Sequence, residues 1–381
     1  MSYERESIAQ TLLADGKGIL AADETVPTLT RRFDTLGTQS TEQSRRTYRE
    51  MLFTAPGAAE FISGVILQDE TIRQQSSAGT PLAQVRSNQG ILPGIKVDTG
   101  AKPLAGSPGE TVTEGLDGLR DRLSEYHGMG ARFAKWRAVI HITDTLPRHA
   151  CVTANVHALA RYAALCQEQS LVPIVEPEVL MDGPHSIERC EQVTGLVLHA
   201  VFRALFEQGV APEGMLLKPN MVIAGKECSR QAAVEEVATA TLRCLRRHVP
   251  AAVPGIVFLS GGQNARLATA HLNAINRLPG PKPWKISFPT GGRFRIRRSM
   301  HGMGRTRTWR PAGGPFPIGP APTARRVSGC IRMRWKRHRA TPMIHRIAET
   351  GATTDTTDRR QRNGRLDDTG FRGGDDGKRA G

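Results

Sequence analysis

Eight short apolar runs, each followed by a longer amphipathic stretch, alternate along the chain from the N-terminus to about Phe288. Short runs rich in β-branched residues are typical of strands, and the stretches between them carry the 3.6-residue hydrophobic period of helices. A strand-then-helix unit repeated eight times predicts an α/β fold, a closed parallel (β/α)8 TIM barrel. The predicted strands end in GILAADE, ISGVILQDE, GIKVD, FAKWR, VPIVEPE, MLLKP, IVFLSGG and KPWKISF.

Charged or polar side chains stand where most of these predicted strands end. Taken singly, a charged residue after a strand is usually a solvated loop position. In a barrel, however, the strand ends converge on one mouth, and that C-terminal face is where barrels carry their chemistry. We therefore expect one shared site. Its predicted members are Asp23, Asp69, Lys96, Lys135, Glu176, Lys218 and Ser260.

Lys218 ends the apolar run MLLK and is followed at once by a proline. Desolvation and a second cation nearby, such as Lys135, disfavour the ammonium form of such a lysine and favour the neutral amine. The amine can attack a ketone, and the protonated imine that results stabilises a carbanion on the adjacent carbon. The sequence therefore predicts a Schiff-base lysine that makes or breaks a carbon–carbon bond.

Carboxylates and a glycine turn at the same mouth supply the other groups that this chemistry needs. Glu176, Glu178 and Asp23 are available to move protons during carbinolamine dehydration and from the alcohol that becomes an aldehyde. The turn from Ser260 to Gly262 offers a hydroxyl and unobstructed backbone N–H groups, which suits a phosphate.

Metal-dependent carbon–carbon lyases are the natural alternative among enzymes. They need clustered imidazole ligands, and the 11 histidines of this chain include no H-x-H or H-x-x-H pair. We therefore expect a reaction that needs no metal and no other cofactor.

Seven motifs at the strand ends together closely resemble the class I fructose-1,6-bisphosphate aldolases, over about residues 3–288. The resemblance implies a lyase that reversibly cleaves fructose 1,6-bisphosphate to dihydroxyacetone phosphate and glyceraldehyde 3-phosphate in glycolysis, without a metal. It also implies a homo-oligomer, a tetramer, with small sugar phosphates as its ligands. The motifs are GKGILAADE, ISGVILQDET, GIKVDTG, FAKWRAVI, IVEPEVL, LLKPNMV and FLSGGQ.

The resemblance further implies a role for each catalytic residue. Lys218 is expected to form the Schiff base, and Glu176 to act as acid and base during imine formation. Asp23 is expected to take the proton from the C4 hydroxyl of the substrate. Lys135 and Arg137 are expected to assist charge handling and substrate binding.

Substrate binding is implied for a second group of residues. Lys96 is expected to bind the distal phosphate, while Ser260 and Gly261 hold the phosphate next to the reacting ketone. Glu178 is a further expected substrate-binding residue.

The net charge of +16 is concentrated in the last quarter of the chain. Residues 1–288 carry 30 Lys and Arg against 29 Asp and Glu, whereas residues 289–381 carry 22 against 7, and 20 of those 22 cations are arginine. The second segment lacks a hydrophobic period, so it buries too little apolar surface to offset the entropy of ordering it. We expect a barrel over 1–288 whose last strand–helix unit is incomplete, and a basic, disordered tail over 289–381.

The tail begins where the family has a Ser-Tyr-Gly-Arg-Ala-Leu-Gln segment, whose arginine binds the ketone-side phosphate. Residues 289–295 can be spelled CCT ACG GGC GGG CGC TTC AGG. Beginning each codon one base earlier gives TCC TAC GGG CGG GCG CTT CAG, which encodes the family segment. We interpret the tail as the product of a one-nucleotide frameshift.

Two alternatives to a working enzyme remain open at this point. The tail could be a genuine arm that binds nucleic acid by releasing counterions, attached to an inactive aldolase-like barrel. The barrel could also be a non-catalytic scaffold, which the chemical character of the strand-end residues disfavours.

The cellular compartment follows from what the sequence lacks. The N-terminal stretch has no apolar run of signal-peptide type, and no run approaches the roughly 18 apolar residues that span a membrane. We expect a cytoplasmic protein.

The frameshift interpretation predicts the outcome of resequencing the coding DNA across Lys285 to Arg298, with an intact mass of the expressed protein as a check. We expect one base more or fewer than this sequence requires. If the frame is confirmed instead, the tail is a genuine extension and the interpretation is wrong.

Overall fold

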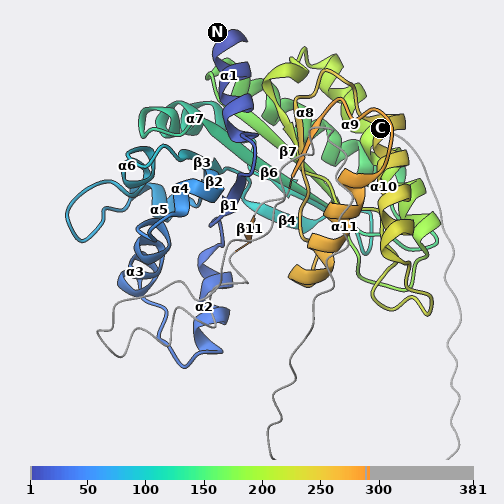
Figure 1. Ribbon diagram of the computed structural model, residues 1–381, viewed down its shortest axis with the longest axis horizontal. Coiled ribbons are helices and arrows are strands. Elements are labelled where there is room, and N and C mark those ends of the chain that lie inside the picture. Colours follow the sequence, from blue (N-terminus) through green and yellow to red (C-terminus); the bar gives the residue numbers. More distant parts are fainter. Residues whose placement is uncertain (1, 288–289, 292–381) are drawn as a thin grey trace, which may run out of the picture. The chain divides into compact units, whose positions relative to one another are not determined.

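The computed structural model describes residues 2–287 and 290–291, and a parallel sheet runs through them (Figure 1). All eight predicted strands are present, and a further short strand at Thr290–Gly291 lies within the segment that was expected to be a disordered tail. The barrel strands are β1 (Gly18–Ala21), β2 (Ile62–Leu67), β3 (Leu92–Lys96), β6 (Phe133–Ile140), β7 (Val172–Val179), β8 (Leu216–Leu217), β9 (Gly255–Val257), β10 (Lys285–Ser287) and β11 (Thr290–Gly291).

The strand order confirms the predicted TIM barrel. Neighbouring strands pair in the order β10-β9-β8-β7-β6-β3-β2-β1-β11, and every pair in this sheet is parallel. Because β10 pairs with β9 while β11 pairs with β1, one short stretch of chain supplies both edges of the sheet. The sheet is thereby nearly closed, which brings its strand ends to one mouth.

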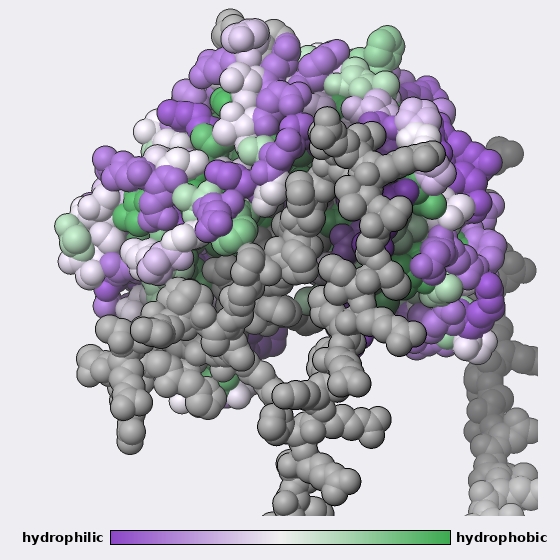
Figure 2. Space-filling view, viewed as in Figure 1, coloured by the Kyte–Doolittle hydropathy of each residue, from purple (hydrophilic) through white to green (hydrophobic). Residues whose placement is uncertain are grey.

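Helices follow the strands and cover the outside of the sheet. Hydrophilic side chains occupy most of the coloured surface on the face in Figure 2. Within the described residues, no helix is long and apolar enough to cross a membrane. The helices are α1 (Ser2–Leu12), α2 (Val26–Asp34), α3 (Glu42–Phe53), α4 (Ala58–Phe61), α5 (Asp69–Arg73), α6 (Leu82–Ser87), α7 (Leu119–Gly128), α8 (His149–Glu168), α9 (Ile187–Glu207), α10 (Val234–His248) and α11 (Ala265–Arg277), with a short 3-10 turn at Pro212–Gly214.

An antiparallel hairpin, β4 (Gly100–Pro103) with β5 (Thr111–Glu114), lies between β3 and α7 and was not predicted. Neither strand carries the apolar run that would have indicated it, and β4 is mostly exposed. Asn155 of α8 holds β5 in place: its Oδ1 accepts from the Thr113 N–H at 3.1 Å and its Nδ2 donates to the Thr111 carbonyl at 2.8 Å.

The strand end at Gly291 lies just past the boundary expected at residue 288. The rest of the expected tail, 289–381, and any helix after the last strand lie outside the described residues. The basic arm and the frameshift therefore stay predictions.

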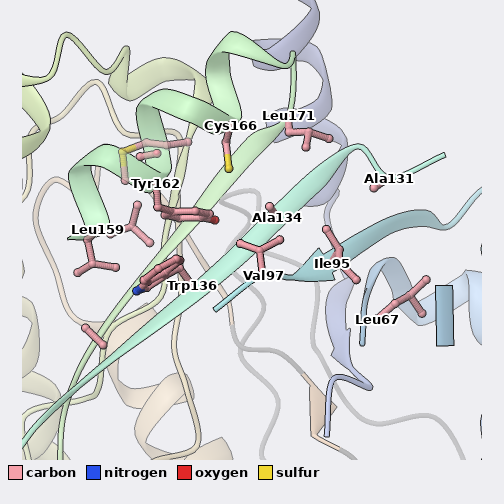
Figure 3. Packing of buried hydrophobic residues seen from close by; sticks show 14 of the residues in the cluster. Leu67, Ile95, Val97, Ala131, Ala134, Trp136, Leu159, Tyr162, Cys166 and Leu171 are labelled. Atoms are coloured by element: carbon pink, nitrogen blue, oxygen red, sulfur yellow. The ribbon is translucent and has the colours of Figure 1, made fainter. Parts of the chain in front are cut away.

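Outward-facing residues of the strands form the main core with the helices. On β6 the alternation of a strand turns Ala134 and Trp136 outward, where both are fully buried. The Trp136 ring packs on Tyr162 of α8, with ring centroids 5.6 Å apart and planes tilted by 32°. Figure 3 shows these rings side by side, with Leu159 and Cys166 of the same helix beside them.

Inward-facing residues form an apolar plug across the barrel, on the side of the N-terminal ends of the strands. Leu12 of α1 is buried within this plug, so the first helix closes the barrel at the N-terminal ends of the strands. The plug consists of Ala9, Leu12, Leu13, Ile19, Ile66, Phe133, Val172, Ile174, Leu216 and Val257.

The interior changes from apolar to charged within two residues along three neighbouring strands. Side chains at i and i+2 share a face of a strand. Phe133 is therefore followed inside the barrel by Lys135, Ile174 by Glu176, and Leu216 by Lys218. The plug is thus the floor of a charged layer at the mouth.

Phe133 fits into the plug because its neighbours across the sheet are glycines. A Cβ atom on Gly94 would lie 2.3 Å from the Phe133 ring, and one on Gly64 would lie 3.1 Å from that ring and 2.5 Å from Leu12. Such approaches are shorter than van der Waals contact, so a side chain at either position would have to displace Phe133 or Leu12.

We predict that Gly94→Ala lowers the free energy of unfolding by about 1–3 kcal/mol, because the new methyl group overpacks the plug. Urea unfolding followed by tryptophan fluorescence measures the change. Adding Phe133→Leu to Gly94→Ala should recover part of the loss. Simple addition of the two single costs would contradict the predicted contact.

Candidate active site

Glu176 of β7 binds two lysines at the mouth of the barrel, one on each carboxylate oxygen. Lys218 Nζ donates to Oε1, and Lys135 Nζ lies 3.3 Å from Oε2. Lys135 of β6 also lies 2.7 Å from the Asp23 Oδ2, just after β1. The side chains of Glu176 and Lys135 are 4% exposed and that of Lys218 is 8% exposed. Four predicted residues thus form one row of alternating charge, in which only the Asp23 side chain, at 17% exposed, is partly open to solvent.

Backbone pairing continues past β8 and fixes the position of Lys218. The Lys218 N–H donates to the Val175 carbonyl at 2.8 Å, and the Pro219 carbonyl accepts from Leu259 at 3.1 Å. Proline has no N–H to offer at this point, so the chain turns out of the sheet after the lysine.

Asn220 ties the end of β7 to the loop after β8 and was not singled out in the sequence. Its Oδ1 accepts from the Val179 N–H at 3.0 Å, and its Nδ2 donates to the Thr194 hydroxyl of α9 at 3.1 Å. The motif LLKPN gave its position, but only the fold shows what this asparagine contacts.

The ionisation of the row follows from its mutual charges. Burial raises the pKa of Asp23, but the ammonium groups of Lys135 and Lys218 outweigh it and lower that pKa to about 2. The pKa of Glu176 is likewise lowered, since the same two lysines outweigh its burial. Burial lowers the pKa of Lys135, but Asp23, Glu176 and Asp98 together raise it above its ordinary value. Both carboxylates and Lys135 are therefore charged at neutral pH.

Lys96 lies at the edge of this row and is held by Asp98, which was not among the predicted site residues. Its Nζ donates at 2.6 Å to both the Oδ1 and the carbonyl oxygen of Asp98. Asp98 Oδ2 accepts from the Arg137 N–H at 3.3 Å, and Asp98 raises the pKa of Lys135. Lys96 and Lys135 are also register partners across β3 and β6.

Arg137 and Glu178 form a second ion pair at the rim, in which Arg137 Nε donates to Glu178 Oε2. Burial lowers the pKa of Arg137, but Glu178 outweighs this and raises it. The Arg137 side chain is 41% exposed, so it is accessible from solvent.

The loop after β9 places Ser260 and Gly261 beside the segment that carries Lys218, because Leu259 bonds to Pro219. Ser260 is exposed, and Gly261 and Gly262 have φ of 55° and 80°. Only glycine adopts two such angles in succession without strain. The loop thus has an exposed serine and two adjacent positive-φ glycines, and its role as a phosphate cradle stays a prediction.

The expectation that Asp69 joins the strand-end residues is wrong. Helix α5 begins at Asp69 itself, and the side chain is 48% exposed. It accepts from Arg73 at 2.8 Å and from the Tyr126 hydroxyl at 2.9 Å. An immediate helix start turns the carboxylate away from the mouth and into a surface ion pair.

The row can carry out proton transfer at a nucleophilic amine. Lys218 has a carboxylate in contact with its Nζ, and a second carboxylate lies one lysine further on. In the described part of the chain, no group of three or more His, Cys, Asp or Glu side chains could hold a metal ion.

Comparison with known proteins agrees with this geometry. A family model described as "Fructose-bisphosphate aldolase class-I" matches residues 4–305. A protein of Xanthomonas campestris named "Probable fructose-bisphosphate aldolase class 1" is 59% identical over 292 residues, which are 76% of this chain and 87% of the relative. "Fructose-bisphosphate aldolase 4, cytosolic" of Arabidopsis thaliana is 51% identical over 290 residues, 76% of this chain and 74% of the relative.

A solved structure is also similar. It is the fructose-bisphosphate aldolase of Plasmodium falciparum in complex with TRAP and a small-molecule inhibitor. The two chains superpose with a TM-score of 0.74 at 49% identity, covering 76% of this chain and 84% of the other.

The low pKa of Asp23 predicts how stability depends on pH. That pKa is about 2 in the folded chain and about 3.9 for an unfolded Asp. Ionised Asp23 therefore stabilises the fold in full above about pH 4, and this contribution is lost as the pH falls toward 2. We expect Asp23→Asn to lower the free energy of unfolding by about 1–2 kcal/mol at pH 5 and by clearly less at pH 3.

Urea unfolding at the two pH values measures this difference. Asp15→Asn is the matched control, because the Asp15 side chain is 95% exposed and lies outside the row. A cost of Asp23→Asn that is equal at pH 5 and pH 3 would contradict the predicted coupling.

Proposed function

The chain belongs to the class-I fructose-bisphosphate aldolase family, and from this premise we propose that Lys218 forms the imine through which it cleaves its substrate. The family establishes a glycolytic carbon–carbon lyase on a TIM barrel. The roles of individual residues are our proposal. The observation that carries it is the shared carboxylate of Glu176 between Lys218 and Lys135.

Imine formation begins with transfer of a proton from Lys218 to Glu176, which contacts its Nζ. The neutral amine attacks the C2 ketone of fructose 1,6-bisphosphate and forms a carbinolamine. Glu176 then returns a proton to the departing hydroxyl, and water and a protonated imine result. Lys135 stays charged beside the other oxygen of Glu176 and keeps the carboxylate oriented.

Cleavage requires a base for the C4 hydroxyl, and we assign this role to Asp23. Its proton acceptance is weak while Lys135 lies 2.7 Å away. Binding of the anionic substrate draws the ammonium of Lys135 toward itself, so the basicity of Asp23 rises when it is needed. As the C3–C4 bond breaks, its electrons move to the imine as an enamine, and the C4 oxygen becomes the aldehyde of glyceraldehyde 3-phosphate.

The two phosphates are assigned to opposite sides of the row. We assign Lys96 to the distal phosphate, with its ammonium shared between that group and Asp98. Arg137, paired with Glu178 at the rim, contacts the substrate beside it. Ser260 and Gly261 bind the phosphate next to the ketone, through a hydroxyl and a backbone N–H. We propose fructose 1,6-bisphosphate as substrate, with no metal and no other cofactor.

Assembly and location complete the proposal. We propose a homo-oligomer, a tetramer as the family resemblance implies. We also propose a cytoplasmic location, which the cytosolic plant relative supports.

We propose further that residues 289–381 are a frameshift product attached to a barrel domain over 1–288. The codon shift at residues 289–295 supports this. The match to the family model extends a little past the proposed boundary, as far as residue 305.

Borohydride reduction in the presence of dihydroxyacetone phosphate tests the imine assignment. We expect a covalent adduct on Lys218, located by peptide mass spectrometry, and no adduct in a Lys218→Met chain. Lys285→Met is the control: Lys285 is a 48% exposed lysine outside the row, and the adduct should still form on Lys218 when it is replaced. A Lys218→Met chain that traps substrate as well as the unaltered chain would refute the assignment.

Glu176→Gln extends the same experiment. The amide cannot accept the proton from Lys218 or return it, so the rate of trapping should fall about 10²- to 10⁴-fold. An unchanged rate would remove Glu176 from the proposed chemistry.

A further inference from the structure

A lysine outside the catalytic row lies against the loop that we assign to the ketone-side phosphate. A Cβ atom built on Gly262 would lie 3.3 Å from the Lys226 Nζ. The ammonium group is therefore beside the backbone of the second glycine in the turn Ser260–Gly262. The family resemblance assigned no role to this lysine.

Backbone hydrogen bonds fix where Lys226 stands. Its N–H donates to the Met181 carbonyl at 2.8 Å, and the N–H groups on either side, of Gly225 and Glu227, donate to His185 and Gly183. Gly225 lies so close that a Cβ there would be 2.1 Å from the Gly183 oxygen. The loop after β8 is thus joined to the loop after β7, while the Lys226 side chain remains 48% exposed and able to turn.

The glycine turn offers hydrogen-bond donors that the described part of the chain does not use. The backbone N–H groups of Gly261 and Gly262 form no hydrogen bond to any described residue. Adjacent N–H groups in a turn of this kind form a concavity that binds anions. An ammonium beside them adds a full positive charge to their partial ones.

In the free chain the Lys226 ammonium is bound by Asp182, at 2.6 Å from its Oδ1. The two side chains are 48% and 62% exposed, and an exposed ion pair of this kind contributes little free energy. A phosphate carries more charge than one carboxylate and is held by the turn at the same time. The exchange of Asp182 for phosphate is therefore favourable.

We infer that Lys226 is a further binding residue for the ketone-side phosphate, and that Asp182 competes with that phosphate for its ammonium group. The inference rests on the proposed function, because it assigns the phosphate to the turn Ser260–Gly262. In the family, the arginine of the Ser-Tyr-Gly-Arg-Ala-Leu-Gln segment binds this phosphate, and this sequence lacks that segment. Lys226 would supply one cationic contact in place of that arginine.

The test measures the concentration of dihydroxyacetone phosphate that gives half-maximal borohydride trapping on Lys218. Lys226→Met should raise this concentration about 5- to 20-fold, the effect of losing one charge-assisted contact. Asp182→Asn should lower it about 2- to 3-fold, because the competing ion pair is lost. The double variant should match Lys226→Met alone.

Lys285→Met is the matched control. Like Lys226, Lys285 is 48% exposed and binds an exposed carboxylate, that of Asp15. Unlike Lys226, it lies at the start of β10 and donates to the Leu13 carbonyl, at the opposite end of the barrel. Lys285→Met should therefore leave the half-maximal concentration of dihydroxyacetone phosphate unchanged. In the condensation direction, Lys226→Met should also leave the KM for glyceraldehyde 3-phosphate unchanged, because Lys96 is assigned to that phosphate.

The outcomes separate the inference from the proposed function. If the unaltered chain forms no adduct on Lys218, the proposed function fails and the inference fails with it. If the unaltered chain forms the adduct but Lys226→Met behaves like Lys285→Met, the inference alone is overturned. If Lys226→Met folds poorly, Asp182→Asn still tests the inference. An Asp182→Asn chain whose half-maximal concentration of dihydroxyacetone phosphate does not fall would overturn the proposed competition between Asp182 and the phosphate.

Discussion

The contact of one carboxylate with two ammonium groups determines the organisation of the site. Glu176 is almost fully buried, and each of its oxygens faces a lysine. Burying a single charge costs several kcal/mol, so none of these groups would be stable there alone. Asp23 extends the row on the far side of Lys135 and completes the alternation of charge. The row is therefore stable only as a set, and removing one member leaves its neighbour uncompensated.

The floor under the row makes this arrangement possible. Phe133, Ile174 and Leu216 lie two residues before Lys135, Glu176 and Lys218 on the same faces of their strands, and they belong to the apolar plug. Because side chains alternate along a strand, the plug and the row are adjacent layers of one barrel interior. The plug excludes water from below, which strengthens the electrostatic interactions above it. The same layering leaves the mouth open toward substrate.

Much of this could be predicted from the sequence, since it depends on periodicity. The strand runs and their charged ends predicted the barrel and the meeting of Lys218, Glu176, Lys135 and Asp23. Which oxygen of Glu176 faces which lysine could not be predicted, because it depends on side-chain rotamers and on the separation of the strands.

The features that the sequence did not predict have local physical causes. Asp69 begins a helix and turns outward, although it follows a strand just as Asp23 does. The hairpin β4–β5 has no apolar run to signal it. Asp98 stands beside Lys96 in the motif GIKVD, but its hold on both Lys96 and the Arg137 backbone appears only once β3 and β6 lie side by side.

The most direct test of the shared-carboxylate site is a crystal structure of the chain after borohydride reduction with dihydroxyacetone phosphate. We predict continuous density from the Lys218 Nζ to C2 of the reduced ligand, with Glu176 in hydrogen-bond contact with that nitrogen and Lys135 on its other oxygen. Density joined to Lys135 or Lys96 instead, or a Glu176 side chain turned away from the adduct, would contradict this assignment.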